Sequence, residues 1–108
     1  MITNTALLII DMQVGLIEPA YQRELDYRGI TNLIVVGDQT EYCVDTTVRR
    51  ATTLGYNVTV AGDAHTTDDD DEAVLSAAQR IAYHNEVLDS FRTDTYTIRV
   101  KPISEIKL

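Results

Sequence analysis

Two stretches decide the fold of this 108-residue chain: Ala6-Leu-Leu-Ile-Ile-Asp11-Met-Gln13 and Gly37-Asp-Gln-Thr-Glu-Tyr-Cys43-Val44. An unbroken apolar run precedes the polar residues in each, as in strands buried on both faces of a parallel sheet. The first stretch places the carboxylate of Asp11 just beyond its strand, and the second places Cys43, the only cysteine, at the start of a helix. Ligands of open α/β sheets bind at the carboxyl ends of the strands, so these two residues predict a site there.

Strands and helices are predicted to alternate along the whole chain. The strand patterns cover residues 6–10, 32–36, 57–61 and 95–100, and the last alternates as an edge strand does. The helical patterns cover residues 20–27, a segment from the N-cap Thr40 to Gly55, and a third helix that starts at Thr66 or Thr67. This order predicts a single α/β domain over residues 1–108 with a parallel sheet.

The third predicted helix carries an acidic run, residues 68–72, in its first turn. Acidic side chains favour a helix N-terminus because of the macrodipole, and the run lacks the spacing of a calcium loop. Its apolar stripe runs from Val74 to Leu88 and includes His84, which is expected to be a core or interface residue. No metal site is therefore expected here.

The connections between the predicted strands also indicate how the helices are placed. Each connection has room for one helix only, so sequential strands are expected to be neighbours. Right-handed crossovers in one direction then place every helix on the same face of the sheet. The opposite face would be bare, and a bare apolar sheet face is unstable in a monomer. We therefore expect a homodimer or higher homo-oligomer that covers this face, or a chain that lacks part of its fold.

Composition and charge exclude several classes of partner. The formal net charge of −8 disfavours nucleic acid and anionic membranes, whose phosphates attract basic surfaces. No apolar run reaches the length of a membrane-spanning helix, and the first residues lack the pattern of a signal peptide. A single cysteine forms no internal disulfide, so a reducing, cytoplasmic setting is expected. A small-molecule substrate is the expected partner, and no cofactor is expected.

Taken together, the motifs resemble the isochorismatase-like cysteine hydrolases, a superfamily that includes nicotinamidases and related amidases. The resemblance rests on Leu8-Ile-Ile-Asp11-Met-Gln13, Gly29-Ile30, Leu33-Ile-Val-Val-Gly37, Thr40-Glu-Tyr-Cys43-Val44-Asp-Thr-Thr-Val48-Arg, Gly55-Tyr56, Asp63-Ala64-His65 and Ala82-Tyr-His-Asn85. The Thr-x-x-Cys-Val block is specific at this spacing, whereas the Asp-x-Gln block alone is a weak signal. The implied architecture is a three-layer, Rossmann-like α/β fold, reduced here to a mostly four-stranded parallel sheet with about three helices.

One segment of the family pattern is absent from this sequence. Members of the family carry two further strands and the catalytic lysine between the Asp-x-Gln strand and the Gly-Ile before the cysteine strand. Here the chain passes almost directly from Tyr21 to Leu25, and the only lysines are Lys101 and Lys107 near its end. The metal-binding histidines of some nicotinamidases also lack counterparts.

The resemblance implies catalytic roles for the residues around the cysteine. Cys43 would be the nucleophile that forms a thioester, and Asp11 the base that takes the thiol proton and later activates water. The backbone amides of Tyr42 and Cys43 would form an oxyanion hole, shaped by a cis peptide bond between Asp38 and Gln39.

Simpler interpretations remain open for these residues. Cys43 could be a small core residue, and Asp11 a turn residue or helix cap. Gln13 and His65 could contact the ligand or support the site, but Gln13 could equally face solvent. A surface loop is the expected place for His65.

The missing lysine separates two hypotheses about function. A carboxylate opposes the ionisation of a neighbouring thiol, and the half charge of a helix N-terminus does not outweigh it. Arg23, Arg28 or a lysine of another subunit would have to supply the missing charge. The first hypothesis is a cysteine hydrolase of amidase type, acting on a small amide or a related C–N or ether substrate and impaired by this absence. The alternative is a catalytically inactive oligomerising scaffold or small-molecule-binding remnant.

Overall fold

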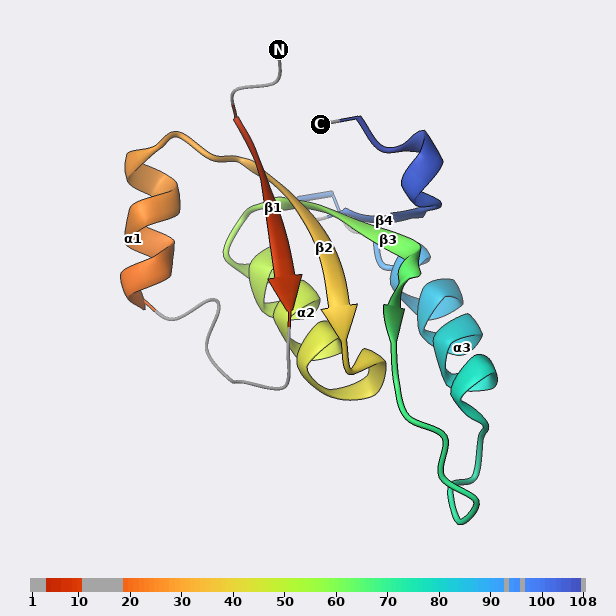
Figure 1. Cartoon of the computed structure of the whole chain (residues 1–108). Helices are drawn as coiled ribbons and strands as arrows, with labels where there is room; N and C mark the ends of the chain where they lie inside the picture. The colour runs from red at the N-terminus through yellow and green to blue at the C-terminus, as the bar shows by residue number, and fades with distance from the viewer. Residues whose placement is uncertain (1–3, 11–18, 93, 96, 108) are drawn as a thin grey trace.

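The computed structural model describes residues 4–10, 19–92, 94–95 and 97–107, and these form one sheet with helices packed on it (Figure 1). Four parallel strands lie in the order β1-β2-β3-β4, which are Thr5–Ile10, Asn32–Asp38, Asn57–Thr66 and Ile98–Lys101. The predicted four-stranded parallel sheet is therefore confirmed. β3 continues beyond its predicted end at residue 61, because it pairs with β2 again after a register shift, at Gly37 and His65.

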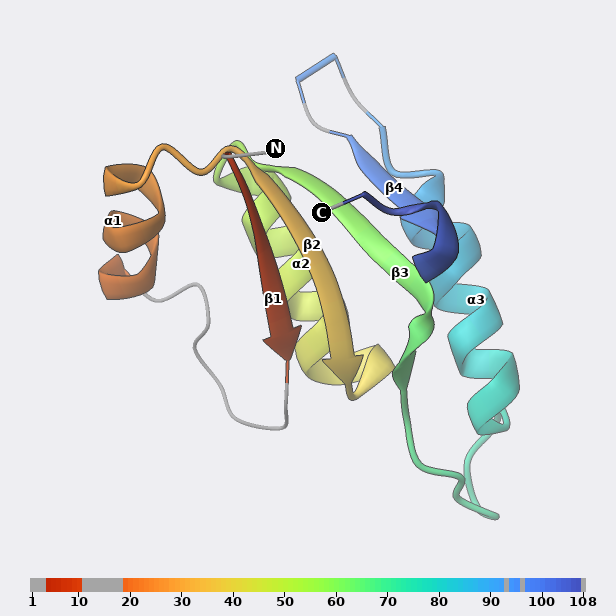
Figure 2. The same cartoon turned by 45° about the horizontal axis from the view of Figure 1, so that its top comes forward.

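The described residues contain three α-helices: α1 (Pro19–Tyr27), α2 (Asp45–Thr53) and α3 (Ala77–Asp89). A π-helical turn, η1 (Thr40–Val44), leads into α2, and a short 3₁₀ turn, η2 (Ile103–Glu105), follows β4. Figures 1 and 2 show α2 and α3 on one face of the sheet, and Leu25 of α1 packs against the same core. None of these helices is long and apolar enough to cross a membrane.

The core lies between the sheet and the helices. Each strand contributes alternate residues, so that Ala6, Leu33, Val58 and Ile98 form one row across the sheet. α2 and α3 close this layer, with these residues fully buried: Val48, Ala51 and Leu88. The burial of Val48 and Ala51 shows that one side of α2 packs on the sheet.

The opposite face of the sheet is only partly bare. On β1, Leu7 and Ile9 point away from the core and remain 43% and 69% exposed. On β2, by contrast, Ile34 is only 5% exposed, because the chain after β4 turns back over β3 and β2 (Figure 1). The expectation of a bare face is therefore correct at β1 and wrong at the middle of the sheet, where the C-terminal segment lies.

The third helix begins later than predicted. α3 starts after Ser76, whose hydroxyl accepts from the Gln79 amide while the Gln79 side chain accepts from the Ser76 amide. The acidic run 68–72 consequently lies in the preceding loop rather than in the helix, and Val74 is 97% exposed. One acidic side chain still serves the helix start, since Asp69 accepts a hydrogen bond from the Ala77 amide at 2.8 Å. The reciprocal Ser76–Gln79 cap fixes the boundary.

Candidate functional site

The carboxyl ends of β1 and β2 are held in close contact. Ile10 of β1 pairs with Gly37 of β2, which has a φ of 127°. A side chain at Gly37 would place its Cβ 1.9 Å from the Ile10 carbonyl oxygen, so only glycine permits this approach. The two strands therefore deliver their following residues to the same edge of the sheet. Asp11 and Gln13, the predicted base and its neighbour, lie outside the described residues.

Cys43 lies in η1, the turn that follows the carboxyl end of β2. It is a free thiol, half-buried, and packs against the edge of the hydrophobic core. The peptide bond between Asp38 and Gln39 is cis, at the position that the family resemblance implies. The turn closes on the Gln39 carbonyl, which accepts hydrogen bonds from the amides of Tyr42 and Val44, both at 3.1 Å.

These contacts bear on the predicted oxyanion hole. The amide of Tyr42 already has the Gln39 carbonyl as its partner, so it would have to share its hydrogen with a substrate oxygen. The role of the Tyr42 and Cys43 amides stays a prediction.

A buried carboxylate oxygen lies just before the turn. Asp38 ends β2, and its Oδ1 is buried with no hydrogen-bond partner among the described residues. The neighbouring Gln39 has a partner, since its Nε2 donates to Asp68 Oδ2 at 3.1 Å. A buried acceptor without a donor costs free energy. Asp38 Oδ1 is therefore an acceptor at the site that a cation or a hydrogen-bond donor from outside the described part of the chain could pair with.

His65 lies in the interior, which corrects the expectation of a surface loop. It is 2% exposed, because β3 extends past its predicted end and carries it beneath α3. Asn85 Nδ2 donates to the Gly62 carbonyl at 3.0 Å, which turns the Asn85 oxygen towards His65. His65 Nε2–H then donates to that oxygen at 2.6 Å, and Nδ1 accepts from the Thr40 hydroxyl at 2.8 Å.

Burial favours the neutral form of His65. Burial lowers the pKa of His65 from its ordinary value of 6.5; the hydrogen bond to Asn85 opposes this shift, and the charge of His84 adds to it. The predicted N-cap role of Thr40 is wrong, since its hydroxyl is committed to His65 rather than to the start of the helix. Thr40, His65 and Asn85 together tie η1 to β3 and α3, and so position the turn that carries Cys43.

The ion pair between Glu41 and Arg80 also supports η1, the turn that carries Cys43. Glu41 accepts from the Arg80 guanidinium and from the Thr67 hydroxyl, and the Glu41 and Arg80 side chains are only 14% and 16% exposed. Arg80 also donates to the carbonyls of Asp68 at 2.6 Å and Leu75 at 3.2 Å, which fixes the loop before α3. Burial alone would raise the pKa of Glu41, but the hydrogen bonds from Thr67 and Arg80 and the Arg80 charge lower it below 4.5.

Several cations that could assist Cys43 are engaged or placed elsewhere in the described part of the chain, whereas Arg23 is exposed on α1. Arg80 is paired with Glu41, and Arg28 pairs with Glu24 on α1. Lys101, the last residue of β4, and Lys107 both line a cavity on the open face of the sheet, together with the first residues of β1 and β2. No three His, Cys, Asp or Glu side chains among the described residues are grouped to hold a metal ion.

The sequence is related to known proteins over most of its length. The isochorismatase domain model matches residues 20–91. A solved isochorismatase family protein is 32% identical, with a TM-score of 0.61, over 74% of this chain and 44% of that one. An isochorismatase from Pseudomonas putida is 31% identical, with a TM-score of 0.66, over 80% of this chain and 43% of that one. The chain therefore belongs to the isochorismatase family.

Other comparisons bear on the fold alone. A cysteine hydrolase from Pseudomonas syringae pv. phaseolicola has a TM-score of 0.68 at 23% identity, over 78% of this chain and 38% of that one. A search of curated protein sequences gave no significant match. The chain spans less than half the length of the solved structures that it matches.

Proposed function

We propose that the chain is a cysteine hydrolase of amidase type that acts on a small amide, or a related C–N or ether substrate, through Cys43. The observation that carries this proposal is the place of Cys43, in the first turn after the carboxyl end of β2, within the matched family region. Ligands of parallel α/β sheets bind at this edge. A half-buried free thiol there can meet a substrate, which a core cysteine could not.

The proposed reaction has two steps with Asp11 as base. Asp11 takes the thiol proton, the Cys43 sulfur bonds to the amide carbonyl carbon, and the C–N bond breaks as the amine leaves with that proton. Water, deprotonated by Asp11, then attacks the thioester, which releases the carboxylic acid and restores the thiol. Backbone amides of the turn would stabilise the oxyanion in both steps. A reducing, cytoplasmic setting belongs to the proposal, because the nucleophile must stay a free thiol.

The alternative is an inactive scaffold or small-molecule-binding remnant of the fold. Two observations favour it: Asp38 Oδ1 is buried without a partner in the described residues, and both lysines lie on the open face instead of near Cys43. Either the proposed site is completed by a cation from another subunit, or its thiol is held back by the neighbouring carboxylates.

We further propose that the protein is a homodimer or higher homo-oligomer through the open face of β1. Leu7 and Ile9 are exposed there, and β1 is an edge strand, whose free backbone groups favour pairing with another chain. Light scattering should give an oligomer for the native protein and a monomer for Ile9→Asp. A folded native monomer at micromolar concentration would contradict the proposal.

The rate of Cys43 alkylation by iodoacetamide against pH separates the enzyme from the inactive alternative. The enzyme requires a half-maximal rate well below about pH 8.5, the ordinary value for a thiol, in the native protein. A rate that rises only above that value, and that increases in Asp11→Asn, would support the inactive alternative. Asp71→Asn is the matched control, because it removes an exposed carboxylate from the loop before α3.

A further inference from the structure

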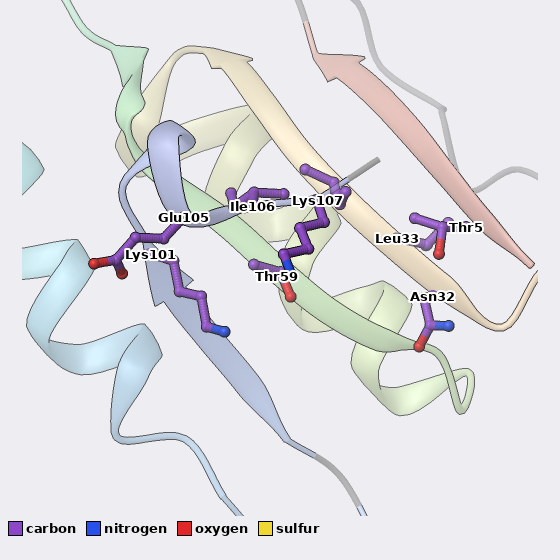
Figure 3. A pocket seen from close by; sticks show the side chains of 9 residues that line it. Thr5, Asn32, Leu33, Thr59, Lys101, Glu105, Ile106 and Lys107 are labelled. Atoms are coloured by element: carbon purple, nitrogen blue, oxygen red, sulfur yellow. The ribbon is translucent and has the colours of Figure 1, made fainter. Parts of the chain in front are cut away.

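The open face of the sheet holds a cavity that the proposed reaction does not use. Its volume is about 400 Å³, within the usual range for small-molecule sites. The C-terminal segment forms one wall, and the first residues of β1 and β2 lie on the other side (Figure 3). The lining residues are Thr5, Asn32, Leu33, Ile34, Thr59, Lys101, Glu105, Ile106 and Lys107. We propose that this cavity binds a small organic anion, a carboxylate joined to a compact apolar group.

Charge gives the first reason for an anion. The chain has a formal net charge of −8 and only two lysines, yet both line this cavity. Arg99 lines an adjoining hollow of about 270 Å³ that shares Asn32 and Thr59 with it. Within the described part of the chain, none of these three cations has an ion pair or hydrogen bond. Among the described lining residues, Glu105 carries the only carboxylate, so positive charge is in excess there.

The arrangement of the side chains gives the second reason. In Figure 3 the Lys107 side chain runs down towards Thr59 of β3, while the Glu105 carboxylate points away from Lys107. An ammonium group and a hydroxyl thus face the same space, and both can donate to a carboxylate oxygen. Among the described residues, neither the Lys107 ammonium group nor the Thr59 hydroxyl has an ion pair or side-chain hydrogen bond. The cavity therefore supplies two donors for an anion, and the Glu105 carboxylate in its lining points away from the Lys107 donor.

The apolar residues of the lining are the reason for proposing an apolar group on the ligand. Ile34, 5% exposed, lies on the sheet side of the cavity, and Ile106 faces it from the C-terminal segment. A bare inorganic anion would leave this apolar surface in contact with water, whereas a ligand with an apolar body would cover it. The cavity lies over the first residues of β1 and β2, and Cys43 follows the opposite end of β2. The proposal consequently does not depend on the activity of Cys43.

Amide-resolved NMR titration of the full chain tests the proposal with benzoate as the probe. Benzamide, which has nearly the same shape without the charge, and inorganic phosphate, which lacks the apolar group, are the comparison ligands. We expect benzoate to shift the amides of Thr5, Asn32 and Thr59, and to bind at least about tenfold more tightly than either comparison ligand. Binding should weaken as salt is added, because the cations are at the surface.

Variants assign the effect to the two lysines. The double substitution Lys101→Met and Lys107→Met should raise the Kd for benzoate about tenfold or more, whereas Lys101→Arg with Lys107→Arg should keep it within about twofold. Arg50→Met is the matched control, because Arg50 is exposed on α2, on the other face of the sheet. Equal binding of benzamide and benzoate, equal loss in Arg50→Met, or phosphate binding as tight as benzoate would each overturn the proposal. Unchanged thermal unfolding of the variants shows that they are folded.

Discussion

The same four strands form both faces of the sheet, but the two faces differ in how far their side chains are exposed. On the helix-covered face, Val35 and Val60 are completely buried, and α2 and α3 close the layer above them. On the open face, Leu7 and Ile9 of β1 remain largely exposed. Along β1 the exposed Leu7 and Ile9 alternate with Leu8 and Ile10, which pack in the core, so burial here depends on the direction of the side chain and not on its hydrophobicity.

Charged side chains show the same contrast. Beside the helix-covered face, Arg80 and Glu41 pair with each other and are nearly buried. On the open face, Lys101 and Lys107 have no ion pair in the described part of the chain. Charges that are paired and buried hold the fold together, whereas unpaired charges at a cavity are free to bind something else. With the proposed anion site on the open face, stability and recognition would be separated between the two sides of one sheet.

The largest expected effect is the difference between matched truncations on the two faces. Leu88→Ala removes a completely buried side chain from α3 and should lower the free energy of unfolding by about 3–5 kcal/mol. Ile9→Ala removes a side chain of the same size that is 69% exposed, so its cost should stay below about 1 kcal/mol. Urea unfolding measures both, at a protein concentration low enough for light scattering to show monomers, so that the proposed oligomer does not cover Ile9. Similar losses in the monomer would contradict the difference between the two faces.

A smaller effect is expected from the ion pair that supports the Cys43 turn. Arg80→Met leaves Glu41 without its cation and should cost about 2–3 kcal/mol of unfolding free energy, because both side chains are nearly buried. Arg92→Met is the exposed control: Arg92 lies 3.8 Å from Asp89, and loss of that contact should cost about 0.5 kcal/mol or less. Lys101→Met on the open face should also cost little. A cost for Lys101→Met as large as for Arg80→Met would remove the contrast between paired and unpaired charges.

The sequence predicted the strands well because their signal is local. Unbroken apolar runs at residues 6–10 and 32–36 match β1 and β2, and the alternation before Pro102 matches the edge position of β4. The start of α3 was also visible in principle, since Ser76 and Gln79 have the spacing of a capping box. The acidic run before it was the stronger signal for a helix start, and it was misleading.

Partners distant in the sequence could not be predicted in this way. His65 is buried because Thr40 and Asn85, 25 and 20 residues away, satisfy its two ring nitrogens. A lone histidine after a strand gives no sign of such partners, although all three residues lie in family motifs. The cover over Ile34 was missed for a similar reason, since nothing in residues 103–107 indicates that the chain folds back over the sheet.

The smallest expected effect is a pH dependence that comes from His65. Its folded pKa is lower than 6.5, so the unfolded chain binds a proton at higher pH than the folded protein does. The stability contribution is complete above about pH 6.5 and is lost as the pH falls below that value. Urea unfolding between pH 7.5 and about 5 should show this decline in the native protein, with Glu41 still ionised throughout, since its pKa lies below 4.5.

The decline should disappear in His65→Gln, which keeps polar groups for Thr40 and Asn85 but does not titrate. His84→Gln is the matched control, and it should keep the decline in a weaker form, because the His84 charge no longer opposes protonation of His65. A decline that persists in His65→Gln would place the titrating group elsewhere. Because His65 holds the Cys43 turn through Thr40, loss of the same hydrogen bonds at low pH should change the rate of Cys43 alkylation beyond the change that thiol ionisation causes. The ratio of the native rate to the His65→Gln rate should therefore change as the pH falls below about 6.5, and a constant ratio would contradict control of this site by the buried side of the sheet.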